Sequence, residues 1–173
     1  MKTMANLFLV GPMGAGKTSV GRALAHALGK PFYDSDQMLE KQLGATLSWI
    51  YDLEGLAGYR QREATLIDEL TQQGPMVLST GGDCIEVPAI RDCLVERGLV
   101  IYMAVSLETQ IKRLKRDRRR PQLQGEDPVT VLIKLWEERE PLYERIADFT
   151  VATDERSVRS VRDEVLAWLR QSE

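Results

Sequence analysis

The segment Gly11–Thr18 has residue types and spacing that are suited to holding phosphate groups. It reads GPMGAGKT and fits the pattern G-x-x-x-x-G-K-[ST] between an apolar run and an amphipathic helical pattern. Such a loop points backbone N–H groups inward, and the following helix N-terminus adds partial positive charge. Lys17 is expected to reach the β- and γ-phosphates, and the Thr18 hydroxyl to take Mg²⁺. The sequence therefore predicts a nucleoside triphosphate site, whose loop residues are Gly14, Ala15, Gly16, Lys17, Thr18 and Ser19.

The phosphate loop by itself does not distinguish a kinase from other nucleotide hydrolases. A GTPase would need a guanine-reading N-K-x-D motif, which this sequence lacks. Large ATP-driven machines need a longer chain than 173 residues. A small phosphotransferase is the favoured interpretation.

Two acidic residues, Asp34 and Asp36, follow the second strand-like run. Positions i and i+2 of an extended chain share a face, so both carboxylates are expected to point toward the phosphate loop. One could hold Mg²⁺ through water while the other accepts a hydrogen bond from an acceptor hydroxyl. The alternative for Asp36 is an N-cap of the helix that begins near Met38.

Charged residues elsewhere are ambiguous on spacing alone. Arg60 and Glu63 are neighbours on one helix and could form an ordinary surface ion pair. Arg139 lies among acids in EEREPLY, which also fits a surface pair. The run KRLKRDRRR from Lys112 to Arg120 resembles a nucleic-acid patch, but the net charge of −3 and the absence of interleaved aromatic residues argue against that partner.

The expected elements place these residues at one edge of a sheet. Strands are expected at 7–10, 31–33, 76–78, 100–105 and 149–152. Helices are expected at 18–28, 38–43, 46–53, 59–70, 89–96, 107–115, 128–145 and 158–169. This alternation predicts an α/β fold with a parallel sheet covered on both faces, whose ligands bind beyond the carboxyl ends of the strands.

The bulk composition is that of a single globular domain. The chain is 43% hydrophobic and 28% charged, and no apolar run approaches the roughly 18–20 residues of a membrane span. The N-terminal apolar run enters a glycine loop directly, which favours a strand over a signal peptide. The two cysteines show no CxxC pattern, so we expect a cytoplasmic protein.

Taken together, the motifs resemble shikimate kinase over nearly the whole chain. The resemblance is carried, in order, by Gly11–Thr18, Asp34-Ser-Asp36, Glu54-Gly55, Tyr59-Arg60, Glu63, Gly81-Gly82, Arg120-Pro121 and Arg139 with Pro141-Leu142-Tyr143. It implies a P-loop nucleoside-monophosphate-kinase-like fold with a five-stranded parallel sheet. It also implies transfer of phosphate from MgATP to the 3-hydroxyl of shikimate, in a monomer with no nucleic-acid or membrane partner.

The resemblance also implies roles for individual residues. Asp36 would bind the ring hydroxyls, Arg60 and Arg139 the carboxylate, and Gly81 and Gly82 would present N–H groups to the substrate. Glu63 would support Arg60, and we predict Thr18 and Asp34 for Mg²⁺. The residues predicted to be catalytic are Lys17, Asp36 and Arg120.

Further expectations concern the nucleotide side of the site. Arg120 would neutralise the transferring phosphoryl group from a lid at about 113–127. Arg113 would lie near the adenine and Arg156 in a loop that flanks it. The acceptor-binding region is expected at about 34–63 of a single 1–173 domain.

The sequence departs from the family pattern at a few positions, of which Asp83 is the most informative. The others are Tyr51 and Tyr59 in place of common phenylalanines, Gln122 in place of a leucine, and Lys-Thr-Ser at the end of the phosphate loop. Asp83 replaces a third consecutive glycine. It could be a turn residue that tolerates positive φ, a competitor for Arg60 or Arg139, or a sign of altered acceptor choice. Quinate or gluconate phosphorylation, or a nucleotide-dependent regulator with an impaired acceptor site, are the alternative functions.

Overall fold

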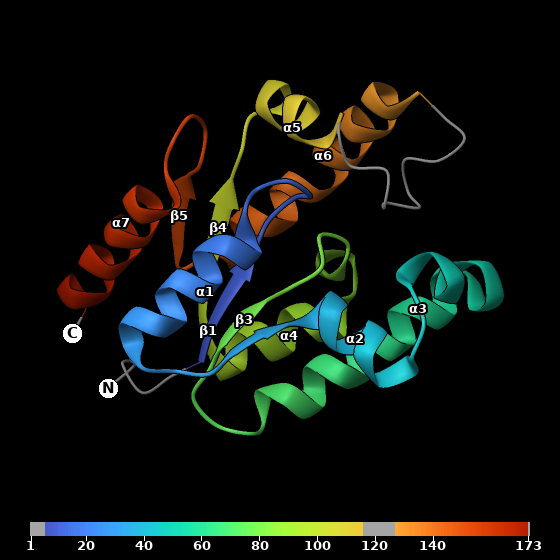
Figure 1. Ribbon diagram of the computed structural model, residues 1–173, viewed down its shortest axis with the longest axis horizontal. Coiled ribbons are helices and arrows are strands. Elements are labelled where there is room, and N and C mark those ends of the chain that lie inside the picture. Colours follow the sequence, from blue (N-terminus) through green and yellow to red (C-terminus); the bar gives the residue numbers. More distant parts are fainter. Residues whose placement is uncertain (1–5, 116–126, 173) are drawn as a thin grey trace.

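The computed structural model describes residues 6–115 and 127–172, which form an α/β fold around one sheet (Figure 1). The strands are β1 (Asn6–Val10), β2 (Phe32–Asp34), β3 (Val77–Ser79), β4 (Gly98–Ala104) and β5 (Phe149–Ala152). They pair in the order β2-β3-β1-β4-β5, and every pairing is parallel. The expected five-stranded parallel sheet is confirmed.

The helices agree with the expected order and differ from it mainly at their ends. They are α1 (Lys17–Leu28), α2 (Ser35–Leu43), α3 (Leu47–Thr71), α4 (Pro88–Arg97), α5 (Leu107–Leu114), α6 (Pro128–Ile146) and α7 (Val158–Gln171), with a short 3₁₀ helix η2 (Cys84–Glu86). The two helices expected at 46–53 and 59–70 are one element, α3, which is interrupted at Gly55 by non-helical backbone.

Each face of the sheet carries its own apolar core. Leu7 and Leu9 of β1 pack with α1 and α7, whereas Phe8 and Val10 pack with α3, α4 and α6. This division follows from the alternation of side chains along a strand, and it explains why β1 is apolar at both its odd and its even positions from Leu7 to Val10. In Figure 1 α1 and α7 lie on the left, α5 and α6 at the upper right, and α2 and α3 at the lower right.

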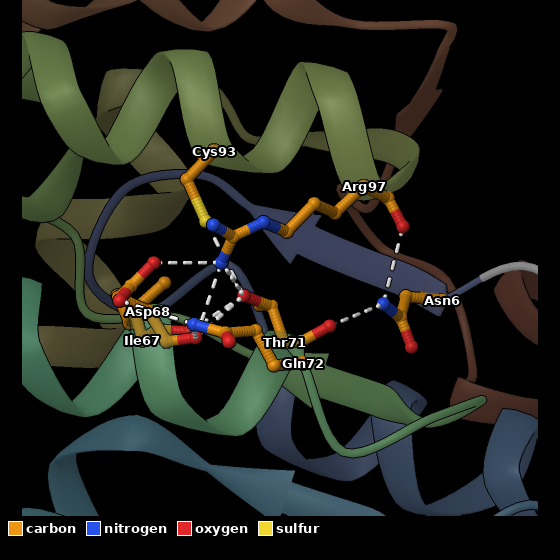
Figure 2. A network of polar contacts seen from close by, with 7 residues as sticks. All are labelled: Asn6, Ile67, Asp68, Thr71, Gln72, Cys93 and Arg97. Carbon is orange, nitrogen blue, oxygen red and sulfur yellow. Dashed lines mark hydrogen bonds and ion pairs between the residues drawn. The ribbon is translucent and has the colours of Figure 1, made fainter.

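A polar network fixes the end of the sheet away from the phosphate loop (Figure 2). Asn6 Nδ2 donates to the carbonyl oxygens of Thr71 and Arg97, at 3.1 Å each. Arg97 Nη1 lies 2.8 Å from both Thr71 Oγ1 and Asp68 Oδ1. These contacts join the start of β1 to the last turns of α3 and α4, so α3, which carries Arg60 and Glu63, is anchored at its far end.

No helix within the described ranges is long and apolar enough to cross a membrane.

Candidate active site

A cavity of about 370 Å³ lies beyond the carboxyl ends of β1, β2 and β3. Residues of the phosphate loop line it together with Asp34, Asp36, Gly82, Asp83 and Arg139. The strand ends therefore meet where parallel α/β sheets bind ligands. Segments separated by more than 100 residues contribute to this one cavity.

The phosphate loop leads from β1 into α1, with Gly16 as the N-cap and Lys17 as the first helical residue. Gly14 and Gly16 both have positive φ, a conformation that glycine adopts without strain. Lys17 is buried, and its Nζ donates to the carbonyl oxygens of Gly11 (2.6 Å) and Pro12 (2.9 Å). The predicted phosphate-binding cation thus lies at the mouth of the loop.

Thr18 and Asp34 meet as predicted, and their oxygens suit a magnesium ion. Thr18 Oγ1 donates to Asp34 Oδ2 at 2.6 Å, across from α1 to β2. Mg²⁺ prefers oxygen ligands and is usually held by one or two protein groups with the remaining positions filled by water and phosphates. The donor set therefore fits this ion.

The alternative role of Asp36 as a helix cap is wrong, because Asp34 caps α2. Asp34 Oδ1 accepts from Gln37 N at 3.1 Å. Asp36 instead turns toward the cavity, where its Oδ1 accepts from Tyr59 OH at 3.0 Å. Burial, followed by the neighbouring carboxylate of Asp36, raises the pKa of Tyr59 well above its usual range, so this phenol remains a donor.

Three carboxylates converge on Gly81. A Cβ at Gly81 would lie 2.6 Å from Glu63 Oε1, 2.8 Å from Asp36 Oδ1 and 3.3 Å from Asp83 Oδ1. Glycine is needed here because of close approach and not because of backbone angle, since Gly81 is not among the glycines with positive φ. Burial, with the negative charges of Asp83 and Asp36, raises the pKa of Glu63.

The expected pair of Glu63 with Arg60 is not formed in this structure. Both carboxylate oxygens of Glu63 are buried and have no hydrogen-bond partner among the residues that the structure describes. Arg60 Nη2 instead contacts Glu86 Oε2 at 2.5 Å, and the same oxygen lies 3.2 Å from Arg139 Nη2. Glu86 was not singled out from the sequence. It lies three residues after Asp83 in η2, and only the packing of α3, α6 and η2 brings it to both arginines.

The glycine pair also differs from expectation at one position. The Gly81 N–H group donates to Ser35 Oγ at 3.0 Å, so it is already engaged by the protein. Gly82 lines the cavity, and its carbonyl oxygen accepts from Tyr143 OH of α6. Of the two N–H groups predicted to meet the substrate, that of Gly82 remains the candidate.

Asp83 is buried in the wall of the cavity. Its φ of −89° is ordinary right-handed backbone, so tolerance of positive φ does not explain it. In the described part of the chain no ion pair joins its carboxylate to Arg60 or Arg139, and Asp83 Oδ2 accepts from Tyr51 OH at 3.4 Å. Burial raises the pKa of Asp83, while the charge of Arg139 opposes this shift.

The predicted nucleotide-side arginines are engaged by the protein. Arg113 donates to the carbonyl oxygens of Gly14 (2.8 Å) and Thr153 (2.9 Å), which joins α5 to the phosphate loop and to the segment after β5. Arg156 donates to Ala152 O at 2.9 Å and pairs with Glu164 of α7 at 2.6 Å. Arg120, Gln122 and most of the expected lid lie outside the described residues.

Comparison with known proteins agrees with this geometry. The family model described as shikimate kinase matches residues 13–170. The chain belongs to the shikimate kinase family.

Individual relatives extend over almost the whole chain. A shikimate kinase of Pseudoalteromonas atlantica is 48% identical over 99% of this chain and 100% of its own length. One from Legionella pneumophila (strain Corby) is 49% identical over 95% of this chain and 94% of its own. Among solved structures, shikimate kinase from Acinetobacter baumannii in complex with shikimate superimposes with a TM-score of 0.96 and 42% identity, covering 99% of this chain and 96% of that one.

Proposed function

We propose that this protein transfers the γ-phosphoryl group of ATP to the 3-hydroxyl of shikimate, giving shikimate 3-phosphate and ADP. The observation that carries the proposal is that one cavity is lined by a phosphate loop, an aspartate and an arginine, namely Lys17 of the loop, Asp36 and Arg139. Family membership and the structural likeness to a shikimate complex support the same acceptor.

The acceptor would be held at both ends. Two guanidiniums offer paired donors to a carboxylate, and the Nε atoms of Arg60 and Arg139 are buried without a partner in the described part of the chain. Asp36 would accept a hydrogen bond from a ring hydroxyl and orient it toward the phosphate loop. The N–H group of Gly82 would add a donor on the same wall.

The nucleotide would lie along the phosphate loop, on Gly14, Ala15, Gly16, Lys17, Thr18 and Ser19. Lys17 would leave its carbonyl partners and bind the β- and γ-phosphates, where it stabilises developing charge. Thr18 and Asp34 would hold Mg²⁺, which neutralises phosphate charge when bound. We assign Arg113 and Arg156 to the base side of the nucleotide and Arg120 to the transferring phosphoryl group.

The organisation of the chain follows from these roles. We assign an acceptor-binding region to about 34–63 and a lid to about 113–127 within one 1–173 domain. Lid closure would exclude water, which protects ATP from hydrolysis. A monomeric, cytoplasmic enzyme is the form that we propose.

An ADP-release assay tests the function against its alternatives. The protein is given MgATP with shikimate, quinate or gluconate in turn, and the position of the phosphate is read by ³¹P and ¹H NMR. Turnover with shikimate and a 3-phosphate product is expected. Preference for quinate or gluconate would show another hydroxy-acid kinase, and ATP binding without turnover on any acceptor would show a nucleotide-dependent regulator.

A further inference from the structure

Glu86 already occupies the two arginines that the acceptor's carboxylate would use. Its Oε2 accepts from Arg60 Nη2 at 2.5 Å and from Arg139 Nη2 at 3.2 Å. The arginines come from different helices, α3 and α6, and one carboxylate oxygen joins them. This is the type of contact that a substrate carboxylate would make in the same place.

We propose that Glu86 is an affinity-determining residue of the acceptor site. Its carboxylate occupies the carboxylate subsite when no acceptor is present, and it competes with the acceptor for Arg60 and Arg139. The inference rests on the proposed function, because it concerns how tightly the carboxylate of shikimate is bound.

The donors that Glu86 leaves unused explain how an acceptor could displace it. The Nε atoms of Arg60 and Arg139 are both buried and have no hydrogen-bond partner among the described residues. Buried donors are normally paired, so an arriving carboxylate gains contacts that Glu86 does not make. A flat carboxylate with two oxygens matches the paired donors of a guanidinium better than one shared oxygen does.

The exposed fractions of the side chains indicate that Glu86 can move relative to Arg139. The side chain of Glu86 is 20% exposed, whereas that of Arg139 is 7% exposed. Glu86 is the last residue of η2, and its backbone N–H is bonded to Asp83 O at 3.1 Å. Its side chain can therefore turn toward solvent while its backbone and the buried arginine stay in place.

Competition between Glu86 and the acceptor's carboxylate should affect the binding of shikimate and not that of ATP. Breaking the contacts of Glu86 opposes acceptor binding and has no counterpart in ATP binding, because these contacts are with Arg60 and Arg139 and not with the phosphate loop. Removal of its charge should therefore lower the KM for shikimate selectively. If Glu86 instead holds the arginines in position for the acceptor, its removal should raise this KM.

Steady-state kinetics of Glu86→Gln and Glu86→Ala distinguish these outcomes. We expect the KM for shikimate to fall about tenfold in both variants, equivalent to ~1.4 kcal/mol, with the KM for ATP within about twofold of the parent. Calorimetric titration with shikimate alone should show the same tightening in Kd. Thermal denaturation confirms that each variant is folded.

Asp68→Asn is the matched control. It removes another carboxylate that pairs with an arginine, at 2.8 Å, but its partner is Arg97 and not one of the two arginines of the acceptor site. Its KM for shikimate should equal that of the parent. An active parent whose KM for shikimate is unchanged or raised in Glu86→Gln would overturn the competition proposal alone. A folded parent that neither binds nor phosphorylates shikimate would overturn the proposed function, and the competition proposal with it.

Discussion

Around Gly81, several side chains that differ from the pattern expected from the resemblance contact one another or a neighbouring carboxylate. Asp83 stands where the resemblance leads us to expect a glycine and Tyr51 where it leads us to expect a phenylalanine, and Tyr51 OH donates to Asp83 Oδ2 at 3.4 Å. Tyr59, another replacement, donates to Asp36 at 3.0 Å, and its ring centroid lies 4.9 Å from that of Tyr51. The phenols therefore provide donors for two of the carboxylates that the pocket contains.

Lys17→Ala should remove most of the turnover. Lys17 is the buried cation of the phosphate loop, and its loss deprives the transferring group of a fixed positive charge. We expect kcat to fall on the order of 10²-fold or more in a steady-state ADP-release assay. A kcat near that of the parent would refute the assignment.

Arg139→Ala should weaken shikimate far more than ATP. A charge-assisted hydrogen bond is worth about 1.5–3 kcal/mol, so the KM for shikimate should rise roughly 10- to 150-fold. Separate titrations of the two substrates give this comparison. An equal effect on both would show that Arg139 is structural or belongs to the lid.

Asp83→Asn should leave acceptor binding nearly unchanged. Asparagine keeps a side-chain oxygen for Tyr51 OH, and the carboxylate of Asp83 is not ion-paired with either arginine in the described structure. We expect the KM for shikimate within about threefold of the parent, against the about tenfold change expected for Glu86→Gln. Asp83→Gly is the companion variant, because it also removes the oxygen. Tenfold tightening in both would identify Asp83 as the competitor, and loss of activity in both would show that it contacts the substrate.

At the scale of elements, the break in α3 positions both tyrosines. Tyr51 precedes Gly55 and Tyr59 follows it, and Gly55 has φ +67° and ψ −175°. Only glycine adopts this conformation readily. The bend is therefore a local property of one residue that decides how two side chains meet the pocket.

Gly55→Ala should destabilise the protein and impair the acceptor site together. We expect about 1–3 kcal/mol less stability in urea denaturation, because alanine is strained at this backbone conformation. The KM for shikimate should rise, because the tyrosines shift relative to Asp36 and Asp83. Gly74→Ala is the control, since Gly74 also has positive φ, at +113°, but lies before β3 and away from the cavity. It should lower stability and leave this KM unchanged, and an equal KM effect in both variants would contradict the role of the bend.

At the scale of the whole molecule, the buried acids couple folding to pH. The pKa of Glu63 is raised from its ordinary value of 4.5, first by burial and then by Asp83 and Asp36. An acid with a higher pKa in the folded state binds its proton more tightly there than in the unfolded chain. The stability that protonated Glu63 contributes is therefore fully present below about pH 4.5. It is lost as the pH rises through the pKa that Glu63 has in the folded protein.

Glu63→Gln should reduce the dependence of the free energy of unfolding on pH. Glutamine keeps the shape and stays neutral, so the variant should gain stability relative to the parent between pH 5 and pH 8. Free energies of unfolding from urea titrations at several pH values give the slope. Glu54→Gln is the control, because Glu54 pairs with Arg62 on the exposed side of α3. A parent and a Glu63 variant with equal slopes would show that Glu63 is ionised in the folded protein.

The sequence alone determined the element order, the phosphate loop and the edge of the sheet where function gathers. These features depend on local periodicity and on glycine, lysine and hydroxyl residues that are adjacent in the chain. Because parallel strands share their carboxyl edge, placing Lys17, Asp36 and Gly82 after successive strands was sufficient to predict that they meet.

The tertiary structure decided which charged groups pair. Asp34 rather than Asp36 caps α2, Ser35 takes the N–H group of Gly81, and Glu86 rather than Glu63 contacts Arg60. Ser35 and Gly81 are 46 residues apart in the sequence, and Arg60 and Glu86 are 26 residues apart. The spacing within α3 places Glu63 beside Arg60. It gives no information about carboxylates of other elements, such as Glu86 of η2, that can pair with the same arginine. The outcome depends on how α3, α6 and η2 pack around the cavity, and local sequence patterns do not encode that packing.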